Sequence, residues 1–192
     1  DWAEQLDDPR IRVLRQRNAG VSAARNAGIE KAAGRFIAFL DTDDEWAPTF
    51  LDRMMEALRT HPHAVLAYCG WRKTGLEGRR NDPFIPPDYE NPEKHATLFI
   101  GCRWPIHAAL SLTESVRKAG GFTAYLRNAE DYALWLEIAT ENQIVRVAEV
   151  LAVYHFHSDA QASANRRRSA EDLLHAQELH IKRHPDFARR MG

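Results

Sequence analysis

A short apolar segment that ends in a cluster of carboxylates, residues 35–44 (RFIAFLDTDD), constrains the fold more than any other part of this chain. The apolar run Phe36–Leu40 predicts a strand buried on both faces of a sheet. Asp41, Asp43 and Asp44 follow where that strand ends. Carboxylates this close repel one another, so a divalent cation bound to phosphate oxygens would supply the missing positive charge. Because ligands of open α/β sheets bind at strand ends, we expect a cation site here.

Strand patterns and helix patterns alternate along the chain. We expect strands at 11–15, 36–40, 64–69 and 106–112, a hairpin of 145–147 with 151–154, and helices at 22–33, 48–60, 113–119, from 130 onward and at 169–184. In the last helix we expect Leu173, Leu174 and Ile181 to point inward. Residues 70–93 are polar and rich in Gly and Pro, which predicts a long loop. A chain of 192 residues suits one domain.

Charge and cysteine content exclude several classes of protein. The formal net charge is −1, so no overall basic field favours binding to nucleic acid. Cys69 and Cys102 form neither a disulfide framework nor a CxxC motif, which favours buried thiols in a reducing compartment. No apolar run is long enough to cross a membrane, and no signal peptide is visible. The chain begins with Asp1 rather than Met, as expected of a processed chain or a fragment.

The acidic cluster has three alternative interpretations. An EF-hand calcium loop is excluded, because its sixth position is Trp46 instead of glycine and its twelfth is Asp52 instead of glutamate. A phosphohydrolase, with Asp41 as nucleophile and Asp43 as acid/base, is chemically possible but leaves the rest of the chain unexplained. A purely solubilising role is disfavoured, because three clustered carboxylates beside an apolar strand are electrostatically costly.

Two further groups of ionisable residues have both a structural and a functional interpretation. Glu130 and Asp131 begin a predicted helix, where carboxylates are favoured by the free amides and partial positive charge of the helix N-terminus. The same position can also direct a carboxylate into a cleft as a general base. His155 and His157 follow a predicted strand, where they are either surface residues or site residues.

The order and spacing of several motifs resemble family 2 glycosyltransferases of the GT-A fold. The motifs are 18–28 (NAGVSAARNAG), 32–44 (AAGRFIAFLDTDD), 120–122 (GGF) and 130–136 (EDYALWL). The resemblance spans roughly Arg10 to Ser163. It implies an α/β GT-A fold, with a mixed sheet flanked by helices, in a single partial catalytic domain over 1–192. Within that domain it implies an acidic metal motif at 41–44, an acceptor and base region at 104–140 and a C-terminal helix at 169–184.

The resemblance also implies an activity. Such enzymes transfer a sugar, with inversion, from a nucleotide-diphosphate donor to a hydroxyl acceptor, and they use Mn²⁺ or Mg²⁺. We expect a UDP-sugar donor, a carbohydrate or lipid-linked acceptor, and a role in cell-surface polysaccharide or glycoconjugate synthesis. The expected location is the cytoplasm, with peripheral attachment at the inner membrane face as a further option.

Individual roles carry over from the resemblance residue by residue. The implied metal ligands are Asp43, Asp44 and His157, and the implied nucleotide-sugar contacts are Asn18, Arg25, Asp41, Asp43 and His157. The implied general base is Asp131, with its neighbour Glu130 as the alternative. Arg25 either contacts phosphate or forms a salt bridge with the acidic cluster. His155 stands where the family usually has arginine, which weakens a role in binding phosphate because neutral imidazole carries less charge than guanidinium.

One departure from the family concerns the start of the chain. Family members begin with a strand–helix–strand unit that carries an aspartate pair for the base and ribose, and nothing before Asp1 supplies it. We therefore interpret the chain as an N-terminally incomplete catalytic domain. The alternative of another class is a catalytically incomplete module whose open sheet edge pairs with a second copy to form a homodimer.

Overall fold

The computed structural model describes residues 5, 7–75, 82–156 and 165–190. Its elements in chain order are α1 (Val21–Lys31), β1 (Phe36–Ile37), β2 (Glu45–Trp46), α2 (Phe50–Thr60), β3 (Ala64–Thr74), α3 (Lys94–Ile100), the 3₁₀ helix η2 (Ile106–Ala108), β4 (Ala109–Leu112), α4 (Thr113–Lys118), α5 (Glu130–Glu141), β5 (Gln143–His155), α6 (Arg166–Arg183) and α7 (Phe187–Arg190). Within the described ranges, no helix has the length and apolar character needed to cross a membrane.

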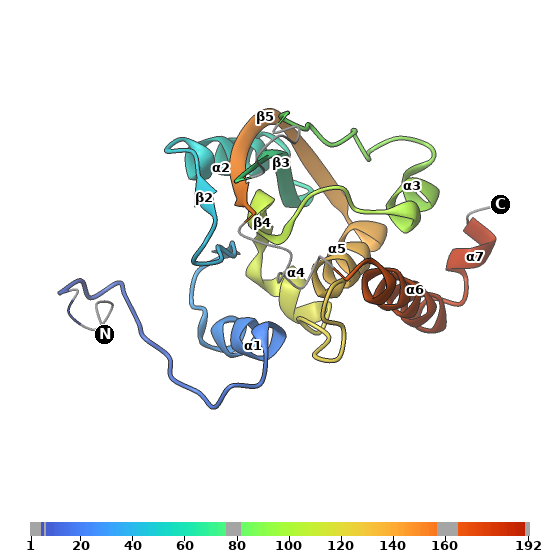
Figure 1. Ribbon diagram of the computed structural model, residues 1–192. Helices are drawn as coiled ribbons and strands as arrows, with labels where there is room; N and C mark the ends of the chain where they lie inside the picture. The colour runs from blue at the N-terminus through green and yellow to red at the C-terminus, as the bar shows by residue number, and fades with distance from the viewer. Residues whose placement is uncertain (1–4, 6, 76–81, 157–164, 191–192) are drawn as a thin grey trace.

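A five-stranded mixed sheet forms the centre of the molecule (Figure 1). The strand order is β1-β4-β3-β5-β2, with β3 and β5 parallel and the other pairs antiparallel. Helix α2 packs against β3 and β5 on one side, whereas α4 and α5 lie on the other side, and α6 packs beside α5 (Figure 1). The predicted α/β architecture, a mixed sheet flanked by helices, is confirmed.

The spacing of apolar residues explains how helix α2 packs against the sheet. Phe50, Met54 and Leu58 are spaced four residues apart, so they share one face of the helix, and all three are buried. Burial of each such side chain contributes about 1.5–3 kcal/mol. The ring of Trp46 stacks on Phe50 at 4.3 Å and thereby joins β2 to the start of the helix. This packing fixes the turn that carries the acidic residues.

Two predicted strands differ in the structure. Residues 11–15 have no strand pairing, and Ile11, Val13 and Leu14 are exposed, because no neighbouring described strand offers a partner. In the apolar run 36–40, only β1 is strand, and it is half-buried at the sheet edge next to β4 rather than buried on both faces. Both results have the same physical cause, since apolar pattern alone does not supply the pairing neighbours that a strand needs.

The predicted hairpin is wrong: residues 145–147 and 151–154 belong to one continuous strand, β5. Residues 148–150 contain no Gly, Pro, Asn or Asp, so the residue types that favour a tight turn are absent there. Strand β3 runs on to Thr74 beside β5, further than the predicted end at residue 69, and a register shift near Gly70 keeps the two paired.

Three other features of the fold differ from expectation: two element boundaries and the buried face of α6. The first residues of the predicted 70–93 loop, 70–74, belong to β3. Helix α3, which follows the loop, was not predicted. The predicted strand 106–112 begins as η2 and becomes strand only at β4. In α6, Leu174 and Ile181 are exposed, whereas the helix buries Ala176 and His180, so the inward face lies about one residue away from the predicted one.

Asn26 of α1 holds the glycine-rich turn before α5. Its amide nitrogen donates to the carbonyl oxygen of Phe122 at 2.9 Å, and its oxygen accepts from the backbone amide of Phe122 at 2.8 Å. The neighbouring Gly121 has φ +69°, and a Cβ there would lie 2.6 Å from the Asn26 oxygen. The ARNAG and GGF motifs are therefore two halves of one contact.

We expect Asn26→Ala to lower the free energy of unfolding by about 1–3 kcal/mol, because the Phe122 amide and carbonyl lose their partner in a part-buried site. Urea denaturation followed by circular dichroism measures the change. Glu30→Ala on the exposed side of the same helix is the matched control, expected within about 0.5 kcal/mol of the parent. Equal stabilities of the two variants would contradict this role.

Candidate active site

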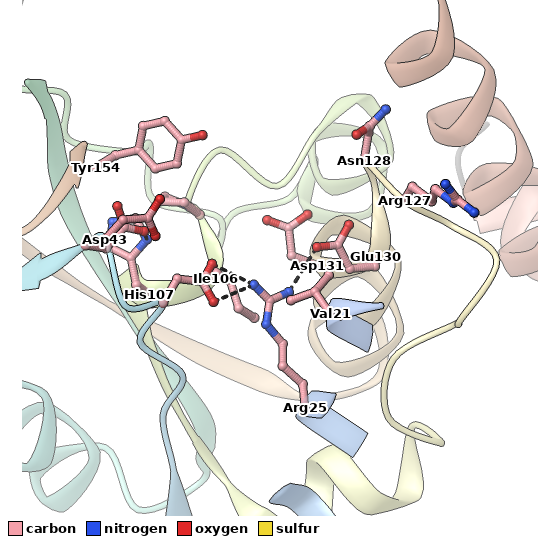
Figure 2. Close-up of a pocket in the computed structure, with 13 residues that line it drawn as sticks. Val21, Arg25, Asp43, Ile106, His107, Arg127, Asn128, Glu130, Asp131 and Tyr154 are labelled. Atoms are coloured by element: carbon pink, nitrogen blue, oxygen red, sulfur yellow. Dashed lines mark hydrogen bonds and ion pairs between the residues drawn. The ribbon is translucent and has the colours of Figure 1, made fainter. Parts of the chain in front are cut away.

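A cavity lies between the acidic motif, the start of α1, the turn before β4 and the start of α5 (Figure 2). Its lining includes Asp41, Asp43, Asp44, Glu130 and Asp131, which come from segments some 90 residues apart in sequence. In Figure 2, Asp43 and His107 lie on one side and Glu130 and Asp131 on the other, with Arg25 between them. The structure thus brings together the two predicted carboxylate groups.

Arg25 connects the two groups of carboxylates. One terminal nitrogen donates to both oxygens of Asp41 at 2.9 and 2.8 Å, and the other donates to Oε1 of Glu130 at 2.9 Å (Figure 2). The Arg25 side chain is 10% exposed, and its guanidinium lies over the ring of Phe122. Burial disfavours the cation, but the hydrogen bonds and charges of Asp41 and Glu130 outweigh this effect and raise the pKa of Arg25. The structure contains the predicted salt bridge to the acidic cluster, and contact with phosphate stays a prediction.

Asp44 is held inside the structure. Its side chain is 1% exposed, its Oδ2 lies 2.9 Å from Nδ1 of His107, and its Oδ1 accepts from the backbone amide of His155 at 3.0 Å. The His155 ring contacts Thr74 and Glu45 instead of entering the cavity. Both Asp44 oxygens thus have a close partner. Asp43 is exposed and lines the cavity.

His107 is a site residue that sequence reasoning missed. Its side chain is fully buried between Asp44 and the ring of Tyr154, which lies nearly parallel to it at 6.0 Å. Its Nδ1 lies within ion-pair distance of Asp44 but makes no hydrogen bond of suitable geometry, and among the described residues its Nε2 has no hydrogen-bond partner. The residue falls within the predicted strand 106–112, where alternation assigned it no special role. A single histidine between Ile106 and Ala108 carries no signal that would have distinguished it.

Glu130 and Asp131 occupy the first turn of α5, as predicted. Burial, followed by the charge of Asp131, raises the pKa of Glu130 to about 7, although the helix-start amide and Arg25 oppose the shift. Burial also raises the pKa of Asp131, against a backbone hydrogen bond from Tyr132 and the charge of Arg25. Both carboxyls thus accept a proton more readily than free acids do.

Glu130 should make stability depend on pH. Its pKa is raised from 4.5 to about 7 in the folded protein, so folding favours the protonated form, and this contribution is lost as the pH rises through that window. Relative to Glu130→Gln, the parent should lose on the order of 2 kcal/mol of unfolding free energy between pH 4.5 and 7. Urea unfolding at several pH values measures the difference. The raised pKa of Glu130 would be contradicted if the difference in unfolding free energy between parent and variant stayed constant over this pH range, or if the parent became relatively more stable as the pH rose.

A second, more apolar pocket adjoins Asp131. It is lined by Trp71, Phe84, Cys102, Arg103, Trp104, Pro105 and Asp131. Trp104 stacks on Tyr68 at 4.5 Å, and the Trp71 indole nitrogen donates to the carbonyl of Arg103 at 3.2 Å, so both rings are held in place. Asp131 and Pro105 line this pocket and the acidic cavity alike. Asp131 therefore stands at the boundary of the two.

The remaining predicted site residues lie elsewhere. Asn18 is exposed in an adjoining hollow at the start of α1, where its side chain accepts from the backbone amide of Gly20 at 3.1 Å. Val21 and Arg127 line both that hollow and the acidic cavity. His157 lies outside the described residues. Cys69 is buried and Cys102 partly buried, and neither forms a disulfide.

Comparison with known structures identifies the fold. A mannosyltransferase from Pyrobaculum calidifontis, solved with GDP-Man and Mn²⁺, superposes with a TM-score of 0.63 at 20% identity, covering 94% of this chain and 49% of that one. TarS 1-349 from S. aureus, solved with UDP-GlcNAc, gives a TM-score of 0.60 at 15% identity, covering 79% and 43%. The predicted GT-A fold is confirmed.

Comparison of sequences identifies the family. The family Glycosyl transferase family 2 matches residues 1–129. Similar proteins include the glycosyltransferase EpsJ of Bacillus subtilis, 32% identical over 78% of this chain and 45% of its own length. They also include TuaG of the same organism, described as a putative teichuronic acid biosynthesis glycosyltransferase, 26% identical over 88% of this chain and 65% of its own.

The chain spans only part of such relatives. It covers 18% of protein y4gI of Sinorhizobium fredii, to which it is 32% identical over 84% of its own length. The family match covers two thirds of the chain and includes the acidic motif and the 120–122 turn. By sequence, the chain belongs to glycosyl transferase family 2.

Proposed function

We propose that this chain carries the catalytic site of a metal-dependent, inverting glycosyltransferase, which moves a sugar from a nucleotide-diphosphate donor to a hydroxyl acceptor. The observation that carries the proposal is the cavity in which Asp43 faces Asp131 across the Arg25 bridge (Figure 2). The diphosphate would lie on the Asp43 side and the acceptor hydroxyl on the Asp131 side.

The acidic side of the cavity fits a hard divalent cation. Carboxylate oxygens are the ligands that Mg²⁺ and Mn²⁺ prefer. Asp43 is exposed in the cavity and would be the direct ligand, with Asp41 beside it. Asp44, already engaged by His107 and His155, would instead fix the turn that presents Asp43. The cation would neutralise charge on the departing diphosphate.

The opposite side of the cavity fits a general base. Asp131 lines both the acidic cavity and the aromatic pocket, so an acceptor held against Trp71 would place its hydroxyl within reach of the carboxylate. Asp131 takes the hydroxyl proton as the new bond to the anomeric carbon forms and the bond to the diphosphate oxygen breaks. Attack from the face opposite the leaving group inverts the anomeric carbon. Glu130, bound to Arg25, is less well placed for this role.

What similar proteins bind or make supports a proposal for the donor and the pathway. TarS is solved with UDP-GlcNAc and the Pyrobaculum enzyme with GDP-Man and Mn²⁺, so a nucleotide-diphosphate sugar fits, and we favour a UDP-sugar with Mn²⁺ or Mg²⁺. The similarity to TuaG, which is described as a teichuronic acid biosynthesis glycosyltransferase, favours a role in polysaccharide or glycoconjugate synthesis.

A panel of UDP- and GDP-sugars, incubated with the full-length protein, Mn²⁺ and mixed carbohydrate acceptors, tests the proposal. Release of nucleoside diphosphate that depends on both acceptor and metal is expected. Release of phosphate from aryl phosphates, abolished by Asp41→Asn, would support the phosphohydrolase alternative instead.

A further inference from the structure

Helices α5 and α6 share a cluster of nitrogen and oxygen donors at a site separate from the cavity. Glu137 of α5 accepts at one carboxylate oxygen from Nδ1 of His180 at 2.8 Å and at the other from Nε2 of His184 at 2.9 Å. His180 lies in the last turn of α6, and His184 follows four residues later as the C-terminal cap of that helix, where its backbone amide donates to the carbonyl of His180 at 2.9 Å. Suitable donor atoms of all three residues lie within 4.8 Å of one another.

This cluster is mostly buried. The exposed fractions of the side chains are 1% for His180, 13% for Glu137 and 26% for His184. The ring of Phe187 packs against His180 at 4.6 Å and forms an apolar wall. Burial raises the pKa of Glu137, but hydrogen bonds from both histidines outweigh burial, so its pKa is lowered and the carboxylate is the favoured form. A charged carboxylate and two imidazoles therefore meet in a sheltered place with one open side.

We propose that Glu137, His180 and His184 form a binding site for a borderline-soft divalent transition metal of the Zn²⁺ type. Two imidazole nitrogens and one carboxylate oxygen make a donor set that suits Zn²⁺, Co²⁺ or Ni²⁺ better than Mg²⁺ or Ca²⁺. Three protein ligands leave a fourth position for water. The proposal is independent of the glycosyl transfer assigned to the acidic cavity.

The distances suit this donor set with small adjustments. Ligand atoms about 2.1 Å from a tetrahedral Zn²⁺ lie about 3.4 Å apart, so the hydrogen-bonded pairs would open slightly as the ion replaces the shared protons. The other nitrogen of His184, Nδ1, lies 3.8 Å from Oε1 of Glu141. A carboxylate behind the metal-bound imidazole is the usual outer partner of a zinc-binding histidine. Arg183 lies 3.7 Å from Glu137 but is half exposed, so its side chain can turn into solvent.

The position of the proposed metal site links it to the acidic cavity. Glu137 lies two helical turns after Glu130 and Asp131 on α5, and α6 also carries Asp172, which accepts from the backbone amides of Arg127 and Asn128. Both of those residues line the acidic cavity. A metal that joins α5 to α6 would therefore stabilise the two segments that present one side of the cavity.

Metal titration of the untagged, chelator-treated protein tests the site. Co²⁺ should give the visible absorption of a four-coordinate nitrogen and oxygen site, Zn²⁺ should displace it at one ion per chain, and excess Mg²⁺ should not. The signal should persist in Asp43→Ala, which separates this site from the acidic cavity. Zn²⁺ should also raise the melting temperature.

Variants decide whether the three residues bind the ion. His184→Gln and Glu137→Gln should abolish the Co²⁺ signal, and Glu141→Gln should weaken Zn²⁺ binding by about 10- to 100-fold. The matched control is His175→Gln, an exposed histidine of the same helix outside the cluster, which should bind like the parent. Absence of saturable Zn²⁺ binding in the parent, or equal binding by His184→Gln and His175→Gln, would overturn the proposal and leave the cluster as a hydrogen-bonded link between two helices.

Discussion

Asp43→Ala is expected to remove metal-dependent donor binding and to lower kcat/KM at least about 100-fold. Asp43 is the exposed carboxylate of the acidic motif in the cavity, so its loss removes the proposed direct ligand while the buried Asp44 and the turn around it remain. A bound cation contributes several kcal/mol of charge stabilisation at a departing diphosphate, and each 1.4 kcal/mol corresponds to about a tenfold change in rate. Steady-state kinetics with varied Mn²⁺ measures the loss.

Asp52→Ala is the matched control for this variant. Asp52 is an exposed aspartate of α2 that does not line the cavity, so its removal changes the net charge equally without touching the proposed ligand. The control should keep parental kinetics and parental dependence on Mn²⁺. If the Asp43 and Asp52 variants behave alike, the acidic motif does not bind the metal of the reaction.

Asp131→Asn should lower kcat by about 10²–10⁴-fold and leave donor binding nearly unchanged. Asparagine keeps the shape of the side chain but cannot accept the acceptor's proton, and general-base catalysis contributes rate factors of this size. Because burial raises the pKa of Asp131, the parental rate should increase with pH as this carboxyl ionises, and the variant should lose that increase. Measurement of kcat at saturating donor and acceptor, over a range of pH, tests both effects.

The variant Glu130→Gln tests whether Asp131 or its neighbour Glu130 is the general base. Glu130 is bound to Arg25, so the variant should lose much less activity than Asp131→Asn. The assignment would be reversed if Glu130→Gln showed the larger loss of kcat with donor affinity retained. Loss of donor affinity in Asp131→Asn would instead show that this residue holds the donor.

Local patterns in the sequence predicted the parts of the fold that local physics controls. The four-residue spacing in α2, the first turn of α5 and the strand 64–69 follow from periodicity and helix-end preferences, and the structure contains all three. Pairing partners were not predictable in this way. The run 36–40 is apolar enough for a central strand, but β1 lies at an edge because only β4 pairs with it among the described strands.

The candidate site was predictable where residue type and motif carried the information. The carboxylates at 41–44 and 130–131 were expected in one site, and the cavity contains both groups. His107 was not predictable, because its role depends on a buried contact with Asp44 across 63 positions of the chain. The Glu137–His180–His184 cluster was missed because its residues meet across two helices, and because the inward face of α6 differs from the one that apolar spacing indicated.

The central claim is that the acidic motif binds a nucleotide diphosphate through a divalent cation. Calorimetric titration of the full-length protein with UDP, with and without Mn²⁺, tests it most directly. Binding should require Mn²⁺ in the parent and be lost in Asp43→Ala while Asp52→Ala binds normally. Equal UDP affinity with and without the ion, or unchanged Mn²⁺-dependent binding in Asp43→Ala, would contradict the proposed metal site.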